Sequence, residues 1–539
     1  MLAKLPRELL DHVSSFLPTP AFNNLRLACK LVENKIFPYW SNAFFKRKQF
    51  MITAFSLQTL VDISRHATLG PCMTHLIIGL DYFRSVGQQY ANTRDDYQQF
   101  QDACDAQELL LDTGAALQLL TTALLNLPNL ESIDVRNFNS PTRYRDIYKY
   151  RSNFRVCPAW KSYGYSEIPD WSPYLALQNG SLFGNNGDIG PSHFVNRVVR
   201  VLLTAIGQSE SPLRGLEVII RPFHHFRTVA LTGGGLGVLP ILGKGIPTKL
   251  PLVLSRLTKL HLDVNLGSDS LPSVGSYQYP FKIPSDMPKS AEEVSDPSST
   301  NLRKLLALTS NLTWLRLNNR SNTWHGSVRL MSWLALNPET PFGVNIEARW
   351  GDSNPKPVSF PLRRLDLGNM RLHTSTLDLL VIKFDKLECL SFRDVHLQPV
   401  QAQLDEMEDD RENRSVWAAF FQKLPKAARN LKQLSLKGIS ESLEPQSIHK
   451  HPVVFYPAIT EDDHVETYNL DLSTIDQAAL EALAANTWIR KVWLETRHRD
   501  YYPDSDNVSI EHGDDGSVDT EHPDGSDEDE DHDEDDVSG

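Results

Sequence analysis

One short pattern of apolar residues recurs along most of this 539-residue chain. Each copy places apolar residues at relative positions 0, 3 and 5, as in LTKLHLDVN, where they are Leu257, Leu260 and Leu262. Residues two apart in a strand point to the same side, so the last two apolar residues of each copy share one side. One copy cannot bury this side alone, whereas stacked copies form a continuous core. The recurrence therefore predicts a solenoid of stacked units.

The copies are numerous but unevenly spaced. Clear copies begin at Leu130, Leu213, Leu257, Leu312, Leu362, Leu387 and Leu431, and weaker ones at Met73 and Ile489. From residue 213 onward the starts lie 44, 55, 50, 25 and 44 residues apart, so only one step has the length of a single repeat. A single copy would also suit an ordinary helix or strand, so the interpretation depends on their number.

The pattern resembles the leucine-rich repeat, L-x-x-L-x-L-x-x-N/C-x-L. Asn265 fills the Asn position of that motif in one copy, whereas other copies have Met370, Val395 and Ile439 there. A turn without that side-chain amide leaves backbone groups to be satisfied in another way. Helical spacing between the strands, as in Leu372 to Phe384, completes each unit. We therefore expect an irregular α/β solenoid.

The first twenty residues, MLAKLPRELLDHVSSFLPTP, suit a targeting signal, a core helix or a docking module. Charged residues such as Arg7 and Asp11 interrupt every apolar run that a targeting signal would need. The apolar residues instead follow helical spacing, with Pro6 at the first helical position. Pro18 ends this helix, and Thr19 with Pro20 starts a second one.

The segment from Leu5 to Trp40 resembles the F-box, whose pattern is L-P-x-E-L-L, then an apolar position, here Val13, then [FY]-L, a short turn, and later L-R-x-V-C-K followed by apolar residues. The resemblance covers about 45 residues, departs at Ala28 where Val is usual, and is closest in wording to fungal members. It implies a three-helix module, residues 1–48, that docks on a Skp-type adaptor and, through it, on a cullin scaffold. The implied adaptor-binding residues are Leu5, Pro6, Glu8, Leu9, Leu10, Val13, Phe16, Leu17, Leu25, Leu27, Cys29 and Lys30. Alternatively, these helices cap the solenoid, which needs a terminal cap.

The remaining domain organisation follows from composition. Residues 49–500 form the predicted solenoid, with inserted loops at 138–195, 267–300 and 398–415. Residues 501–539 form a predicted disordered tail, because from Asp504 onward it has 17 acidic residues and no Lys or Arg. The formal net charge of −13 therefore leaves +4 for the rest of the chain. The tail either solubilises the protein or binds a basic partner.

Cysteine usage and hydropathy indicate a compartment. The five cysteines form no C-x-x-C pair, which favours free thiols in a reducing, cytoplasmic and/or nuclear compartment. No stretch approaches the ~20 apolar residues of a membrane span, so we expect no membrane partner. The basic segment Phe44 to Phe50 predicts a solvated helix end, and we expect no nucleic-acid partner.

Motifs for catalysis, cofactors and metals are incomplete. Gly237 to Gly245 has one residue too many for a phosphate loop and lacks its Ser/Thr. Thr232 to Gly237 lacks the third glycine of a dinucleotide turn, and no G-x-S-x-G nucleophile motif is present. His224 and His225 are adjacent and would face opposite sides of a strand, which suits metal binding poorly. We therefore expect no enzyme activity, no cofactor and no metal.

Two function hypotheses remain. The first is a substrate-recognition subunit of an SCF-type ubiquitin ligase, whose repeats hold a target protein near the transfer machinery. The second is a repeat-based interaction scaffold that joins no ligase. Side chains between the inward leucines would line the concave face, and their mixed charges predict a polar protein target. The target-binding candidates are His261, Asp263, Arg316, Asn318, Asp366, Arg393, Ser435 and Lys437.

Overall fold

The computed structural model describes residues 2–81, 83, 94–138, 162–164, 191–220, 249–266, 297–320, 325–338, 356–399, 415–442, 450–455, 469–473, 475 and 477–489. All of them belong to one compact unit, Met1–Val492. A second unit, Trp493–Gly539, contains none of them, so the predicted acidic tail lies outside the described residues. Most of the three predicted insertions also lie outside them. The segments 191–195 and 297–300 are exceptions, because each begins a helix where we predicted a loop.

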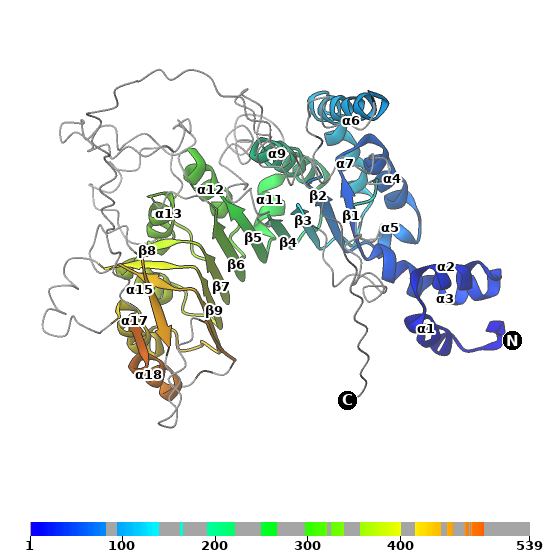
Figure 1. Ribbon diagram of the computed structural model, residues 1–539. Helices are drawn as coiled ribbons and strands as arrows, with labels where there is room; N and C mark the ends of the chain where they lie inside the picture. The colour runs from blue at the N-terminus through cyan, green and yellow to red at the C-terminus, as the bar shows by residue number, and fades with distance from the viewer. Residues whose placement is uncertain are drawn as a thin grey trace, which may run out of the picture. The chain divides into compact units, whose positions relative to one another are not determined.

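Short helices occupy the N-terminus (Figure 1). They are the 3-10 helix Leu2–Lys4 and the α-helices α1 Arg7–Phe16, α2 Thr19–Leu27 and α3 Lys30–Phe45. Pro6 and Pro18 stand at the N-caps of α1 and α2, with ψ angles of 153° and 158° that lie outside the helical region. α1 begins at Arg7, so Pro6 is an N-cap where we expected the first helical position, and α2 begins at Thr19.

These helices have a core of their own. The buried residues Leu10, Phe22, Val32 and Ile36 form a cluster separate from the main core. The Lys35 ammonium group donates hydrogen bonds to the carbonyl oxygens of Ala3 (2.9 Å) and Leu5 (2.8 Å), which fixes the first residues against α3. The helices therefore pack as one module at the start of the chain.

A ten-stranded sheet follows, in the order β1-β2-β3-β4-β5-β6-β7-β9-β11-β14. Its neighbours pair in parallel, except that β14 is antiparallel to β11. The strands are β1 Arg47–Met51, β2 His75–Gly79, β3 Ser132–Arg136, β4 Gly215–Ile219, β5 Lys259–Val264, β6 Trp314–Asn319, β7 Arg364–Gly368, β9 Cys389–Arg393, β11 Gln433–Lys437 and β14 Asn469–Leu472. Stacking in sequence order is the arrangement of a repeat solenoid.

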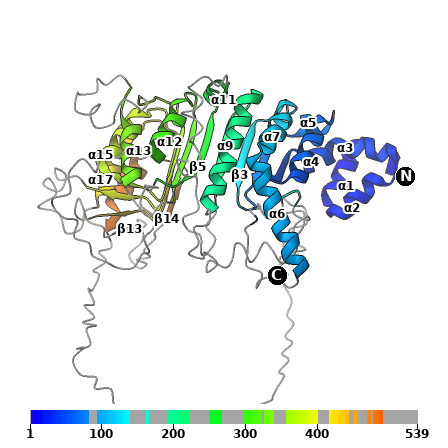
Figure 2. The same ribbon diagram turned by 90° about the horizontal axis from the view of Figure 1, so that it is seen from above.

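Helices connect successive strands and form a layer against the sheet (Figures 1 and 2). They are α4 Ala54–Arg65, α5 Leu69–Cys72, α6 Arg94–Asp112, α7 Ala115–Leu125, α9 Pro191–Ser209, α11 Leu250–Ser255, α12 Pro297–Ala307, α13 His325–Ala335, α15 Thr374–Lys383, α17 Val416–Ala427 and α18 Gln477–Ala485. The predicted helix between Leu372 and Phe384 is confirmed by α15. Parallel strands require such crossovers, because a hairpin turn joins only antiparallel strands.

The repeated apolar pattern builds the core. Eight of the nine copies become consecutive strands from β2 to β11. The second apolar position forms one register row of buried residues: Leu76, Ile133, Leu216, Leu260, Leu315, Leu365, Leu390 and Leu434. The ninth copy, beginning at Ile489, runs into residues outside the described part of the chain.

The strand β1 lies where the sequence predicted a helix end. The basic segment Phe44 to Phe50, expected to be a helix end, contains the start of β1 instead. Phe50 and Met51 are fully buried, and the carbonyl oxygen of Lys46 accepts hydrogen bonds from the backbone N–H groups of Thr74 (3.1 Å) and His75 (3.0 Å). Lys46 and Arg47 remain exposed while the segment pairs with β2, so solvated basic side chains are compatible with a strand here.

A second sheet runs β15-β13-β12-β10-β8. Its strands are β8 Arg371–His373, β10 His396–Gln398, β12 Ser440–Glu441, β13 His451–Phe455 and β15 Thr487–Ile489. Left-handed residues join β7, β9 and β11 to β8, β10 and β12: Asn369 (φ 48°), Asp394 (φ 53°) and Gly438 (φ 61°). Residue types that tolerate this conformation occupy all three positions. The residues at the motif's Asn position, Met370, Val395 and Ile439, are buried in the main core.

An Asn series does exist, at a different position from the motif's. Asn129, Asn311 and Asn430 each directly precede the first leucine of a copy. Their amide groups donate to the carbonyl oxygens of Pro71 (2.9 Å), Ser255 (2.7 Å) and Asp385 (2.9 Å). Each acceptor belongs to the unit of the neighbouring strand, so these side chains tie adjacent units together where each strand begins.

Candidate functional site: the polar sheet face and the exposed helical stripe

Side chains that alternate with the buried leucines form the other side of the ten-stranded sheet, which we call the polar face. From β3 to β11 the strand register places on it Asp134, Arg136, Glu217, Lys259, His261, Asp263, Trp314, Arg316, Asn318, Arg364, Asp366, Ser391, Arg393, Ser435 and Lys437. All eight sequence-predicted target-binding residues belong to this set. The face is not uniform, because its charges find partners in one stretch and remain accessible in another.

Over β3, β4 and β5, the charges of the polar face neutralise one another. Asp134 is fully buried, pairs with Arg136 and lies 2.7 Å from the Nε2 atom of His75. Glu217 lies 2.6 Å from the Lys259 ammonium group. Burial acts to raise the pKa of Glu217, but the hydrogen bonds and charges of His261 and Lys259 hold that pKa well below its usual range. This stretch is a closed ionic network.

His261 belongs to this network. Its side chain is buried, and its Nδ1 atom lies 3.4 Å from the Glu217 carboxylate. The imidazole meets the Trp314 ring edge-on at a centroid distance of 4.4 Å. Burial lowers the pKa of His261, although the adjacent Glu217 acts in the opposite direction. We predicted a contact with a target, but the structure encloses this side chain within the protein.

Asp263 is enclosed in the same way. Its carboxylate accepts hydrogen bonds from the backbone N–H of Ile220 (2.8 Å), the Asn318 amide (2.9 Å) and the Arg320 guanidinium (3.1 Å). These donors follow β4, lie on β6 and follow β6, so Asp263 ties three neighbouring units together. It is 2% exposed and is not available for direct contact with a target.

Trp314 marks the transition along the polar face. Its indole N–H donates to Asp366 at 2.6 Å. The Lys259 ammonium and the Arg364 guanidinium each lie 4.4 Å from the ring centroid, as in cation–π pairs. Arg364 also donates to Asp366 at 3.0 Å, so Asp366 is held from two sides and is largely buried.

An open groove of about 380 Å³ lies over β7, β9, β11 and β14. Four of the predicted target-binding residues line it: Asp366, Arg393, Ser435 and Lys437. The short side chains Cys389, Ser391 and Ser435 form its floor and leave the space open, while longer side chains stand around them. The predicted residues Arg316 and Asn318 lie beside the groove on β6, half-buried. Sequence reasoning missed Arg364, Gln433 and Asp471, which also line it.

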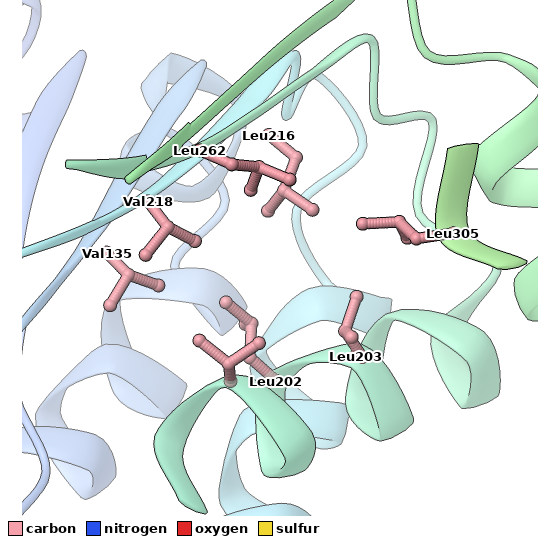
Figure 3. A pocket seen from close by; sticks show the side chains of 8 residues that line it. Val135, Leu202, Leu203, Leu216, Val218, Leu262 and Leu305 are labelled. Atoms are coloured by element: carbon pink, nitrogen blue, oxygen red, sulfur yellow. The ribbon is translucent and has the colours of Figure 1, made fainter. Parts of the chain in front are cut away.

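A second cavity lies within the core and is apolar. It measures about 10 Å³ and is enclosed by side chains of β3, β4, β5, α9 and α12. Figure 3 shows Val135, Val218 and Leu262 facing Leu202 and Leu203. A space of this size, without polar partners, is a packing gap rather than a ligand site.

An apolar stripe is exposed on the N-terminal module. Leu9, Val13 and Phe16 of α1 are 51%, 41% and 76% exposed. Their spacing of i, i+4 and i+7 puts them on one face of the helix. Leu27 and Leu31, at the junction of α2 and α3, are 68% and 54% exposed. Isolated exposed leucines are ordinary, but a helical row of three large apolar side chains is typical of an interaction site.

The other predicted adaptor-binding residues divide by exposure. Pro6, Glu8, Cys29 and Lys30 are exposed, and Leu5, Leu17 and Leu25 are partly buried against the module core. Leu10 has no exposed surface, so it supports the module from within and is not available for direct contact. The side of α1 facing the core and the side facing solvent are thus both apolar.

Statements about metal sites, catalytic motifs and membrane spans apply to the described residues alone. Within them, no group of three or more His, Cys, Asp or Glu side chains could hold a metal ion. The glycine-rich segments Thr232 to Gly237 and Gly237 to Gly245, and the pair His224 and His225, lie outside this part of the chain. No single described helix has the length and apolar composition of a membrane span; α6 and α7 meet that test only together and are bent by 68°.

Comparison with known proteins adds little. No family model matches the chain, and no curated protein matches it. Among solved structures, the leucine-rich repeat-containing protein LegL7 from Legionella pneumophila is similar over 74% of this chain and 92% of that chain, with 12% sequence identity and a TM-score of 0.21. Because that score is low, the repeat interpretation depends on the strand register and the buried leucine rows described above.

Proposed function

We propose that this chain is a substrate-recognition subunit of an SCF-type ubiquitin ligase. In this proposal the N-terminal module, which resembles an F-box, docks on a Skp-type adaptor and thereby on a cullin scaffold. The polar face of the repeat sheet holds the target protein. The chain performs no covalent chemistry, and it acts by bringing target lysines close to the ubiquitin-transfer machinery.

The exposed stripe of Leu9, Val13 and Phe16 is the observation that carries the proposal. These side chains belong to the segment that resembles the F-box, at positions of its pattern. The module has a core of its own that does not include these three side chains, so its internal packing does not explain why they are apolar. Each large apolar side chain that a partner covers completely contributes roughly 1.5–3 kcal/mol. An adaptor surface complementary to the stripe would gain from all three.

The repeat body supports the second half of the proposal. The units are tied to one another by parallel pairing and by the Asn129, Asn311 and Asn430 bridges. Such a framework positions the side chains of the groove in a fixed pattern. Recognition by side chains on rigid strands loses little conformational entropy on binding.

The test is co-purification with a Skp-type adaptor. The intact chain should retain the adaptor, and a Val13→Ser/Phe16→Ser double variant should lose it. A Leu379→Ser/Ile382→Ser variant is the matched control, because these α15 side chains are also exposed, at 50% and 59%, but lie outside the module. If the intact chain does not bind the adaptor, the chain is a repeat-based scaffold outside any ligase, and the helical module is a cap.

A further inference from the structure

The groove over β7, β9, β11 and β14 has an excess of accessible positive charge. Arg364, Arg393 and Lys437 line it, with Asp366 and Asp471 as its carboxylates. Asp366 is turned inward by Trp314 and Arg364, as described above. Within the described part of the chain, neither Arg393 nor the neighbouring Arg316 has a carboxylate within ion-pair distance. The rim is therefore cationic where it meets solvent.

The remaining carboxylate is already engaged. Asp471 lies 3.2 Å from the Lys437 ammonium group, and a hydrogen bond from Ser435 together with Lys437 lowers its pKa. It is exposed and thus offsets part of the positive charge at one side of the groove. The three cations and two carboxylates that line the groove leave one formal positive charge. Arg316, beside the groove, adds another.

Arg393 and Lys437 are neighbours across β9 and β11, whereas Arg364 lies apart from them along the strands. The strand register pairs Arg364 with Cys389, so Arg393 lies four residues further along the neighbouring strand. Four residues of strand span about 13 Å. One phosphate group held between Arg393 and Lys437 would not also reach Arg364. Negative charges carried on successive residues of a peptide match this spacing.

The dimensions of the groove agree with a short peptide. Three strand-to-strand steps from β7 to β14 measure about 14 Å. An extended peptide covers that distance with about four residues. The lining contains the hydroxyl groups of Ser391 and Ser435, and its leucines, Leu390, Leu434 and Leu472, belong to the register row of the core side. Polar groups in this position disfavour a lipid.

We propose that this groove binds an acidic linear segment, rich in Asp and Glu, of the target protein. The inference rests on the proposed target-binding role of the polar face and is independent of how the adaptor docks. The carboxylates of the segment pair with Arg393 and Lys437, and the floor hydroxyls meet its backbone. Such electrostatic contacts give the complex a strong dependence on ionic strength.

The experiment measures fluorescence anisotropy of a fluorescein-labelled peptide with eight consecutive Glu residues. A peptide with eight Gln residues is the neutral comparison. Both the full chain and a chain ending at Val492 are titrated, because the chain's own acidic C-terminal residues have the chemistry of the probe. Saturable binding of the Glu peptide by either chain, weakened by added salt, is the expected result.

Two double variants locate the site. Arg393→Gln/Lys437→Gln removes two cations of the groove and should weaken binding at least tenfold. Arg363→Gln/Lys432→Gln removes two exposed cations that pair with Glu388 where β7 and β11 begin, and it should change binding less than twofold. Both variants alter the net charge equally.

Three outcomes would overturn the inference: no saturable binding by either chain, equal binding of the Gln peptide, or equal losses in the two double variants. Adaptor retention is measured on the same preparations. If the chain retains the adaptor but does not bind the Glu peptide, only the acidic-segment inference is refuted. A chain that binds the peptide but not the adaptor refutes only the ligase proposal.

Discussion

The stretch of the polar face over β3, β4 and β5 differs from the stretch over β7, β9 and β11 in where its charged side chains find partners. In the first, Asp134 and Glu217 are buried against Arg136 and Lys259. In the second, the neighbouring pair Ser391 and Ser435 is uncharged, and Arg393 is exposed to solvent. Both stretches share the same leucine spacing and backbone pairing. The leucines therefore set the scaffold, and the residues between them decide whether a stretch is closed or open.

The difference has an energetic meaning. Buried charges on the first stretch must remain paired, because an uncompensated charge in the interior is costly. Exposed charges of the second stretch, such as Arg393, stay hydrated, so a single substitution of one of them should have a small effect on folding. Under the proposed target-binding role, stability and recognition would belong to different parts of one face.

The largest effect should come from breaking the closed stretch. Asp134→Asn leaves Arg136 and His75 beside a neutral side chain, and we expect the free energy of unfolding to fall by about 3 kcal/mol. Asp471→Asn, which removes an exposed partner of Lys437, should cost less than about 1 kcal/mol. Urea unfolding of both variants measures the contrast, and equal losses would show that the two stretches do not differ in this way.

A buried carboxyl group next to the open stretch gives the second prediction. Glu441 of β12 is fully buried, and burial raises its pKa to about 7, opposed by hydrogen bonds from Ser415 and from the backbone at the start of α17. The folded protein therefore keeps this proton over a pH range in which the unfolded chain, with its ordinary value of 4.5, has lost it. Stability from this group is present below pH 4.5 and is lost as the pH rises to about 7.

Glu441→Gln removes this titration. The unfolding free energy of the variant minus that of the wild type should rise by about 3 kcal/mol as the pH increases from 4.5 to above 7. Burial also lowers the pKa of His396 to about 3. Both proteins retain His396, so its titration cancels when the two are compared. Unfolding curves at pH 4.5 and pH 8 are sufficient. A difference that is the same at both pH values would contradict the protonated, buried state.

The smallest effect concerns the turn that closes the open stretch. Gly438, with a φ of 61°, follows β11, and an added Cβ atom would lie 2.5 Å from the Asp394 carboxylate. Gly438→Ala should cost about 2 kcal/mol, combining left-handed strain with the close contact. Gly114→Ala, at a φ of 75° with open space around it, should cost about 1 kcal/mol. Thermal unfolding distinguishes them, and equal costs would mean that Asp394 moves aside freely.

The scaffold was predictable from the sequence because its signal is local and repeated. Leu260 and Leu315 belong to copies of one spacing, and that spacing alone indicates strands with a shared buried side. β1 was missed because Arg47 and Lys48 interrupt the pattern, and only pairing with β2 makes it a strand. The bridging amides were missed as well, although an Asn directly before the first leucine of three copies was a visible signal.

The state of the polar face was not predictable from the sequence. His261 and Arg393 both stand between inward leucines, so the pattern treats them alike. What separates them is the residue on the neighbouring strand. Glu217 lies beside His261 although 44 residues separate them in the chain, whereas the register places Gly368 and Lys437 beside Arg393. Without knowledge of which strands are neighbours, a charge that is paired and one that is exposed cannot be distinguished.

Our central claim is that the helical stripe and the groove hold different partners. The most direct measurement titrates both the Skp-type adaptor and the eight-Glu peptide against the Val13→Ser/Phe16→Ser and Arg393→Gln/Lys437→Gln variants. We predict that the first variant loses only the adaptor and the second loses only the peptide. Loss of both partners in either variant, or retention of the adaptor by the stripe variant, would contradict the claim.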